Sequence, residues 1–205
     1  EFPARESPEK HRILEGYFAL AHRTKSSTEE ALEKFINVYK ENKQSVSAIV
    51  GMALAFMMQK NPNKAKNQLK QIKKLEYSIE DADQYEKGYL LLAEIYSQNG
   101  KIDMAIQQVD MALRSNRSCA KAWEMLGMLS EKEHSFQDAA DCYENAWNLE
   151  HEKNPAVGFK LAFNYLKAQR YVSAIDICHQ VLSRHPDYPK MRKEILDRAR
   201  SSLRP

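Results

Sequence analysis

Glycine and cysteine are scarce in this chain, and long apolar runs are missing from it. Six glycines and three cysteines occur among 205 residues, and the sequence contains no glycine-rich phosphate loop, HExxH or GxSxG pattern. No apolar run approaches the roughly 20 residues that cross a bilayer, and nothing at the start resembles a signal peptide. We therefore expect a protein that is neither an enzyme nor inserted in a membrane, and that needs no cofactor.

The three cysteines do not form a recognisable framework. Cys119, Cys142 and Cys178 lie far apart and have no CxxC spacing, which suits a reducing compartment such as the cytoplasm. A zinc site needs clustered ligands, and His179 points in a different direction from Cys178 on a helix. We expect buried thiols and no metal site.

Basic residues are concentrated at the C-terminal end. Residues 189–205 carry six basic against two acidic side chains, whereas the net charge of the whole chain is +3. Six cations on one short helix without interleaved aromatic residues are a weak indication of nucleic-acid binding. We expect no nucleic-acid partner, and a salt-sensitive mobility shift with RNA or DNA would reveal one.

The chain does contain a repeat. In residues 120–153, Trp123, Leu126, Ala139 and Tyr143 occupy the fourth, seventh, twentieth and twenty-fourth positions of a 34-residue unit. These are positions of the tetratricopeptide signature, in which each unit is a pair of antiparallel helices.

Small residues recur where the two helices of such a pair would cross. The eighth positions of five units are Ala19, Ala53, Ala93, Gly127 and Ala162, and the twentieth positions are Ala31, Ala65, Ala105, Ala139 and Ala174. A large side chain at such a crossing typically costs about 1–3 kcal/mol. The pattern therefore predicts closely packed helix pairs.

The period predicts an all-α fold, a right-handed superhelical tetratricopeptide-repeat solenoid of five helix pairs and a C-terminal capping helix. After a lead-in segment at 1–11, the repeats occupy 12–45, 46–79, 86–119, 120–153 and 155–188. The cap at 189–205 is amphipathic, as expected where a solenoid end would otherwise expose its apolar face. Because the chain lacks an initial Met and begins with Glu1-Phe2, which an EcoRI site encodes, we expect a fragment of a longer protein that includes its C-terminus.

Several helix ends can be placed from the sequence. Ser27 with Glu30 has the spacing of a capping box. Asn61 and Asn154 precede prolines and are expected to cap helices, and Asn99-Gly100 is expected to end one.

Six additional residues, placed at 80–85, break the period between the second and third repeats. They are acidic, and lysines precede them at 64, 66, 70, 73 and 74. We expect these charged side chains to lie on a solvent-exposed face, and a charged docking patch is the alternative.

The inner groove of such a solenoid is lined mainly by the first helix of each pair. The carboxylate clamp of chaperone-binding members needs Lys at the fifth and Asn at the ninth position of a repeat. This chain has neither residue at those positions, and large apolar residues occur on the same helices of the second and fifth repeats. We hypothesise that a hydrophobic partner, either an amphipathic helix or another subunit, contacts Val50, Leu54, Met57, Met58, Phe159, Phe163 and Leu166. The alternative is that some of them belong to the core between repeats.

The last part of the chain carries a longer resemblance. The run NPAVGFKLAFNYLKAQRYVSAIDICHQVLSRHPDYPKMRKEILDRARSSLRP, with NRSCAKAWEMLGMLSEKE upstream, resembles the C-terminal end of the large tetratricopeptide-repeat subunit of intraflagellar transport complex A. The resemblance is most specific over about 114–205 and weaker, though consistent, over 1–113.

This resemblance implies a non-catalytic scaffold in retrograde ciliary transport and ciliary cargo trafficking. It implies other complex A subunits and ciliary cargo adaptors as partners, and the cilium, with the ciliary base and axoneme, as the location. A peptide-binding tetratricopeptide adaptor of the co-chaperone type is the alternative function.

Overall fold

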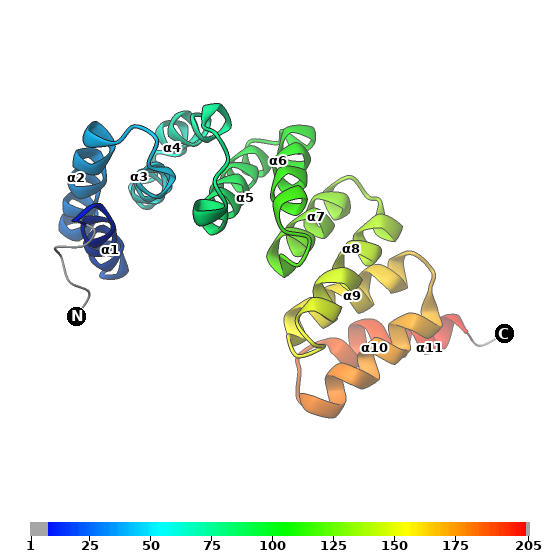
Figure 1. Ribbon diagram of the computed structural model, residues 1–205. Coiled ribbons are helices and arrows are strands. Elements are labelled where there is room, and N and C mark those ends of the chain that lie inside the picture. The colour runs from blue at the N-terminus through cyan, green and yellow to red at the C-terminus, as the bar shows by residue number, and fades with distance from the viewer. Residues whose placement is uncertain (1–7, 204–205) are drawn as a thin grey trace. The chain divides into compact units, whose positions relative to one another are not determined.

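The computed structural model describes residues 8–203, and all regular secondary structure in that range is helical (Figure 1). The fold is therefore all-α, as the repeat pattern predicts. Contacts divide the chain between Gly100 and Lys101 into two compact units, which we describe separately.

Unit 1 contains five α-helices, which are α1 (Pro8–Ala21), α2 (Lys25–Glu41), α3 (Val46–Met58), α4 (Pro62–Leu69) and α5 (Ala82–Gln98). Each helix packs on the one before it in sequence, and α3 also contacts α1 while α5 also contacts α3. A helix pair followed by the first helix of the next pair is thus the local packing unit.

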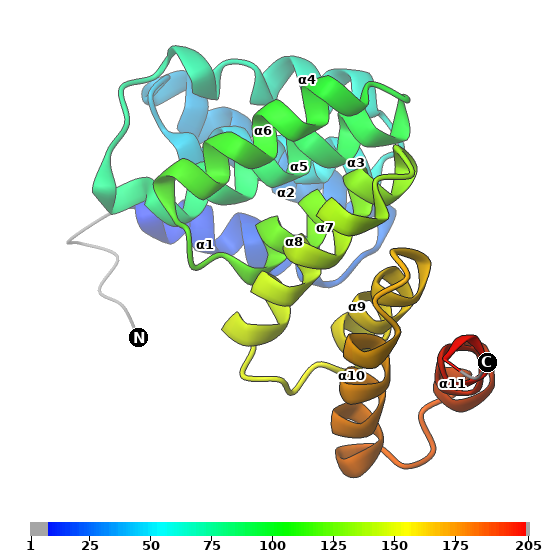
Figure 2. The same cartoon turned by 90° about the vertical axis from the view of Figure 1, so that its right-hand side faces the viewer.

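Unit 2 contains α6 (Ile102–Ser115), α7 (Ala120–Lys132), α8 (Phe136–Leu149), α9 (Pro155–Lys167), α10 (Tyr171–Arg184) and α11 (Asp197–Ser202). A π-helical segment, η3 (Met191–Leu196), leads into α11. Helices α9 and α10 run side by side, and α11 lies against α10 (Figure 2).

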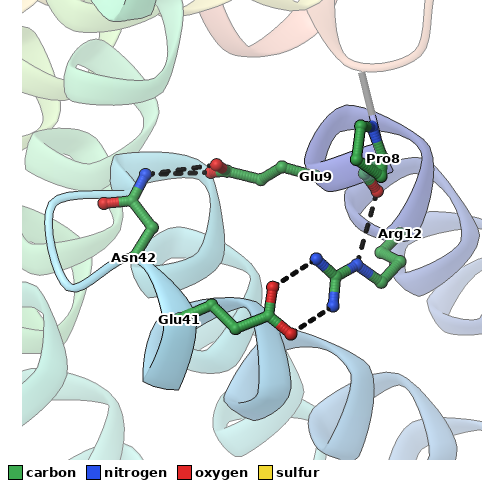
Figure 3. A network of polar contacts seen from close by, with 5 residues as sticks. All are labelled: Pro8, Glu9, Arg12, Glu41 and Asn42. Atoms are coloured by element: carbon green, nitrogen blue, oxygen red, sulfur yellow. Dashed lines mark hydrogen bonds and ion pairs between the residues drawn. The ribbon is translucent and has the colours of Figure 1, made fainter. Parts of the chain in front are cut away.

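Two helices correspond to each of the five expected repeat ranges, but α1 and α5 each begin before the expected range. Helix α1 begins at Pro8, so the lead-in prediction is wrong for residues 8–11 and lies outside the described residues for 1–7. The first turn of α1 is helical because it is tied to the end of α2 (Figure 3). The Arg12 guanidinium donates to both carboxylate oxygens of Glu41, at 2.6 and 2.5 Å, and Asn42 donates to the Glu9 carboxylate at 3.2 Å.

The small residues lie inside, as their pattern predicts. All five alanines at the twentieth positions are 0% exposed, and the residues at the eighth positions are buried as well. A Cβ atom added to Gly127 would lie 3.0 Å from the Tyr143 ring of α8. The close approach of paired helices therefore depends on these positions.

The helix ends lie where the sequence predicts them, but the residue predicted to cap α2 is wrong. The capping box at α2 is formed by Thr24 and Ser27, because the Thr24 hydroxyl accepts the Ser27 N–H at 3.1 Å and the Ser27 hydroxyl accepts the Thr24 N–H at 3.1 Å. Ser27 is therefore the third helical residue and not the N-cap. Asn154 caps α9 as expected, by accepting the Ala156 N–H at 3.1 Å.

Asn61 and the Asn99-Gly100 pair also stand at helix ends. Asn61 precedes the first residue of α4, although its side chain makes no capping hydrogen bond. Asn99 ends α5, and Gly100 follows at φ 71°, a left-handed conformation that favours glycine.

The insertion between the second and third repeats is partly helix and partly turn. Helix α4 has only eight residues, and two short 3-10 turns, η1 (Ile72–Lys74) and η2 (Ile79–Asp81), lead to α5. Residues 82–85 form the first turn of α5, so part of the insertion lengthens that helix at its start. The Tyr85 hydroxyl donates to the carbonyl of Glu76 at 2.6 Å and holds the turn region against α5.

The C-terminal segment packs on α10 and closes the core of unit 2. Met191, Ile195 and Ala199 are 0% exposed and belong to the same cluster as Cys178 of α10. Leu203, which directly follows α11, is 50% exposed. The apolar face therefore ends at α11.

Candidate protein-interaction site

The residues predicted to contact a partner lie on two helices in different units. Val50, Leu54, Met57 and Met58 are on α3 in unit 1, whereas Phe159, Phe163 and Leu166 are on α9 in unit 2. The two sets are therefore two candidate surfaces, each with its own geometry.

Val50 does not reach the surface of unit 1. It is 1% exposed, and its Cγ2 lies 3.3 Å from the position that a Cβ atom of Gly88 in α5 would take. The alternative interpretation, core between repeats, is the correct one for this residue. Sequence alone misplaced it because α3 is apolar on nearly every side and is covered by four neighbouring helices.

The rest of the α3 surface is small. Leu54 and Met57 are half-buried, and Met58 is 39% exposed. A methionine side chain adapts easily to a partner because it is unbranched and flexible, but one leucine and two methionines on a single helix offer a partner little surface to bury.

The α9 residues are half-buried and rest on the core of unit 2. Phe159, Phe163 and Leu166 all pack against the buried cluster. The ring of Phe159 lies beside Tyr188, at 6.1 Å between centroids. Phe163 and Leu166 also line an open groove, so they combine a core contact with an accessible surface.

This groove, which we name the α9–α11 groove, has a volume of about 580 Å³. Its lining consists of Phe163, Leu166, Lys167, Gln169, Tyr171, Asp197, Arg198, Ser201 and Ser202. The volume is in the range of sites that hold a small molecule or a few side chains of a partner.

Apolar and charged groups lie beside one another in the α9–α11 groove. Phe163, Leu166 and Tyr171 supply apolar surface, Lys167 and Arg198 supply two positive charges, and Asp197 supplies one negative charge. The Lys167 ammonium lies 5.4 Å from the centroid of the Phe163 ring, within cation–π range. The groove can therefore accept an apolar side chain that has a carboxylate near it.

The contribution of α11 to this groove could not be read from the sequence. Arg198 lies on α11, more than thirty residues after Phe163 along the chain, and only the packing of the C-terminal segment brings the two together. Lys167 could have been found from its place on the same helix as Phe163 and Leu166.

A partly buried polar network ties α9 to α7 and α8. The Glu131 carboxylate accepts from the Tyr143 hydroxyl at 3.0 Å and from the Asn164 amide at 2.5 Å. It thereby joins α7, α8 and α9. Burial, with the nearby Glu131 charge, raises the pKa of Tyr143 well above its ordinary value, so the phenol stays protonated and keeps donating.

A second polar contact links α7 and α9. The Lys160 ammonium donates to the Glu124 carboxylate at 2.7 Å and also lies 5.7 Å from the centroid of the Tyr143 ring. Together with the Glu131 network, it makes α9 a firmly positioned element.

The cysteines are structural, as expected. All three are at most 9% exposed, and burial raises the pKa of Cys142 to about 11 and that of Cys178 to about 12. Between Pro8 and Leu203, His, Cys, Asp and Glu side chains do not gather in groups of three or more that could hold a metal ion. Within the same range, each helix is too short or too polar to span a bilayer.

Solved structures share this fold. A crystal structure of MamA protein aligns with a TM-score of 0.68 and 18% identity, covering 92% of this chain and 97% of that one. A crystal structure of YrrB, described as a TPR protein with an unusual peptide-binding site, aligns with a TM-score of 0.63 and 13% identity, covering 98% of this chain and 97% of that one. At these identities the likeness establishes the tetratricopeptide-type fold alone.

Curated relatives are similar in sequence along almost the whole chain. Human tetratricopeptide repeat protein 21B is 53% identical over 194 residues, which cover 95% of this chain and 15% of the relative, and human tetratricopeptide repeat protein 21A is 47% identical with the same coverage. The chain thus spans 15% of the length of these relatives. The family described as the tetratricopeptide repeat protein 21 C-terminal ARM domain matches residues 1–200. This match confirms the resemblance drawn from residues 114–205, and the chain belongs to the tetratricopeptide repeat protein 21 family as its C-terminal domain.

Proposed function

We propose that this chain is a non-catalytic scaffold that joins other proteins into intraflagellar transport complex A for retrograde transport in cilia. Membership in the tetratricopeptide repeat protein 21 family supports a scaffold, and the resemblance of the C-terminal run supports the ciliary role. The ciliary base and axoneme are the proposed locations, and other complex A subunits and cargo adaptors are the proposed partners.

The α9–α11 groove is the surface that supports this proposal at the level of contacts. It places apolar rings, which are half-buried, beside exposed cations. Insertion of one Leu or Phe side chain of a partner would contribute about 1.5–3 kcal/mol. A carboxylate of the same partner would pair with Lys167 or Arg198.

The co-chaperone alternative is not favoured by these surfaces. Its clamp needs Lys and Asn at the fifth and ninth positions of one repeat, where α9 has Phe159 and Phe163. Two phenyl rings cannot hold a terminal carboxylate by charge and hydrogen bonds.

Two substitutions test the groove in ciliated cells. We expect Arg198→Glu and Phe163→Asp to reduce co-purification of complex A subunits with the tagged chain at least about tenfold, because losing one of the few central anchors of an interface costs about 2 kcal/mol or more. The measurement is quantitative mass spectrometry of the purified material, with helical circular dichroism to verify folding.

Arg192→Glu is the matched control, since Arg192 is also exposed in the C-terminal segment but does not line the groove. It makes the same change of charge and should leave co-purification unchanged. Recovery of chaperones alone by the unaltered chain would contradict the ciliary role, and unchanged recovery by both groove variants would exclude the groove as the contact site.

A further inference from the structure

The segment that joins α4 to α5 presents two large apolar side chains to solvent. Ile79 is 85% exposed, more than any other large hydrophobic residue between 8 and 203, and Tyr77 is 47% exposed. Both belong to residues 76–83, which we name the insertion tip because they overlap the six residues that break the repeat period. In repeat proteins such insertions map to loops on one face, often the binding face.

The backbone of the insertion tip is held in place although its apolar side chains are not covered. The buried Tyr85 of α5 donates from its hydroxyl to the Glu76 carbonyl at 2.6 Å, and its ring lies 5.1 Å from that of Tyr77 between centroids. The Ser78 hydroxyl accepts the Glu80 N–H at 3.3 Å. A partner that binds here therefore spends little binding free energy on ordering the loop.

The charge of the insertion tip is of one sign. It contains no Lys, Arg or His, and its four carboxylates belong to Glu76, Glu80, Asp81 and Asp83. Lysines precede the tip at 70, 73 and 74, but among residues 8–203 no basic side chain forms an ion pair with any of these four carboxylates. Burial, with the nearby Glu80 and Glu9 charges, raises the pKa of Asp81. The tip therefore combines exposed apolar side chains with uncompensated negative charge.

This combination decides which kind of partner the insertion tip fits. Nucleic acids and anionic membrane surfaces carry negative charge and would be repelled by it. A protein surface that has Lys and Arg around an apolar pocket complements both the charge and the apolar side chains.

We propose that the insertion tip is a docking site for a partner protein with an apolar pocket rimmed by Lys and Arg, which receives Ile79 with Tyr77 beside it. Ile79 is the anchor, because it contributes little to the core of unit 1 and loses the most exposed surface on docking. The carboxylates of Glu80 and Asp83 pair with the basic rim. The proposal does not depend on the α9–α11 groove, which lies in unit 2.

Photo-crosslinking in the full-length chain in ciliated cells tests the proposal. A benzophenone amino acid in place of Ile79 keeps an apolar side chain at the tip and forms a bond to a group in contact with it on irradiation. We expect a protein product in which mass spectrometry maps the crosslink to an apolar pocket with Lys or Arg at its rim. The same amino acid in place of Val172, which is 61% exposed in unit 2, should not give this product.

Charge reversal at the tip tests the complementarity. Combining Glu80→Lys with Asp83→Lys should lower the yield of the product about tenfold or more, because like charges then face each other across the contact. Glu29→Lys with Glu33→Lys is the matched control, since both glutamates are exposed on α2 away from the tip. It makes the same change of charge and should leave the yield unchanged.

Several results would overturn the proposal. They are a yield at Ile79 no higher than at Val172, a product that both charge reversals leave unchanged, and a crosslink to nucleic acid, to lipid, to another part of the same chain or to a second copy. Arg198→Glu should not change the product, so failure of the α9–α11 groove as a contact site and failure of the insertion tip are separate outcomes.

Discussion

In unit 1, α1 and α3 approach α2 closely because each has a glycine against the ring of Phe35. The Phe35 side chain of α2 is 0% exposed, and Gly16 and Gly51 lie against it. A Cβ atom at Gly16 would stand 2.7 Å from the ring, and one at Gly51 would stand 2.4 Å from it. Both distances are far inside van der Waals contact, so the ring occupies the space that side chains would need.

Gly51→Ala should therefore destabilise the chain by about 1–3 kcal/mol, the usual cost of overpacking a core. Denaturant unfolding followed by circular dichroism would measure it. Because the conflict is with the ring, Phe35→Leu in the same chain should recover part of the loss, so the two changes should be non-additive. An unfolding midpoint unaffected by Gly51→Ala would show that α3 can move away from Phe35.

A second effect at the residue scale concerns the ion pair at the start of α1. The hydrogen bond and charge of Arg12 hold the pKa of Glu41 below its ordinary value. A carboxyl with a lowered pKa in the folded state stabilises that state above its unfolded pKa, and the effect is lost as the pH falls through the folded value. Arg12→Ala should raise the pKa of Glu41, which carboxyl NMR would detect, and should lower stability at neutral pH but not in strong acid.

Glu41→Gln provides the control for that experiment. It should remove the same pH-dependent contribution, and combining it with Arg12→Ala should add nothing further. A Glu41 pKa that stays low without Arg12 would assign the shift to other groups.

At the scale of elements, the C-terminal segment decides whether unit 2 has a closed core. Met191 and Ile195 come from a π-helical turn, and the Met191 sulfur lies 3.5 Å from the Cys178 sulfur. The same segment supplies one side of the α9–α11 groove through Arg198. Core closure and the candidate interaction surface therefore depend on the same short element.

Ending the chain at Tyr188 should expose Cys178 and lower its pKa from about 12 toward its ordinary value, because burial is the main cause of the shift. Thiol modification mapped by mass spectrometry should show Cys178 reacting much faster than in the intact chain. Cys142 of α8 serves as the internal control, and its rate should change little. If Cys178 stays unreactive after the truncation, α10 is covered by something other than η3 and α11.

At the scale of the whole molecule, repetition supplies both the fold and its surfaces. Within unit 1 each helix packs on the one before it, and within unit 2 the same holds from α7 to α10, where η3 and α11 cover the last pair. The boundary between the two compact units falls between α5 and α6, inside the third predicted repeat. Function in such a protein is a property of faces and grooves that several helices share.

Some features of this repeat fold could be predicted from the sequence, and others could not. The alanines at the twentieth positions were correctly predicted to be buried, because a small side chain recurring at one position of a repeat marks a closely packed site. The capping box at α2 was misplaced by three residues, since Ser27 and Thr24 both have side chains that can cap a helix. For the candidate site, Phe163 and Leu166 were predicted on a surface they do line, whereas Val50 was not.

The sequence by itself determined the all-α class, the period and the small residues between paired helices, because these depend on local spacing along one chain. Tertiary structure decided which apolar residues stay accessible, because exposure depends on what the neighbouring elements cover. Val50 is buried because α5 lies over it, and Phe18 is exposed because no element within residues 8–203 packs over its ring. Phe163 lines a groove because a distant C-terminal helix places Arg198 beside it.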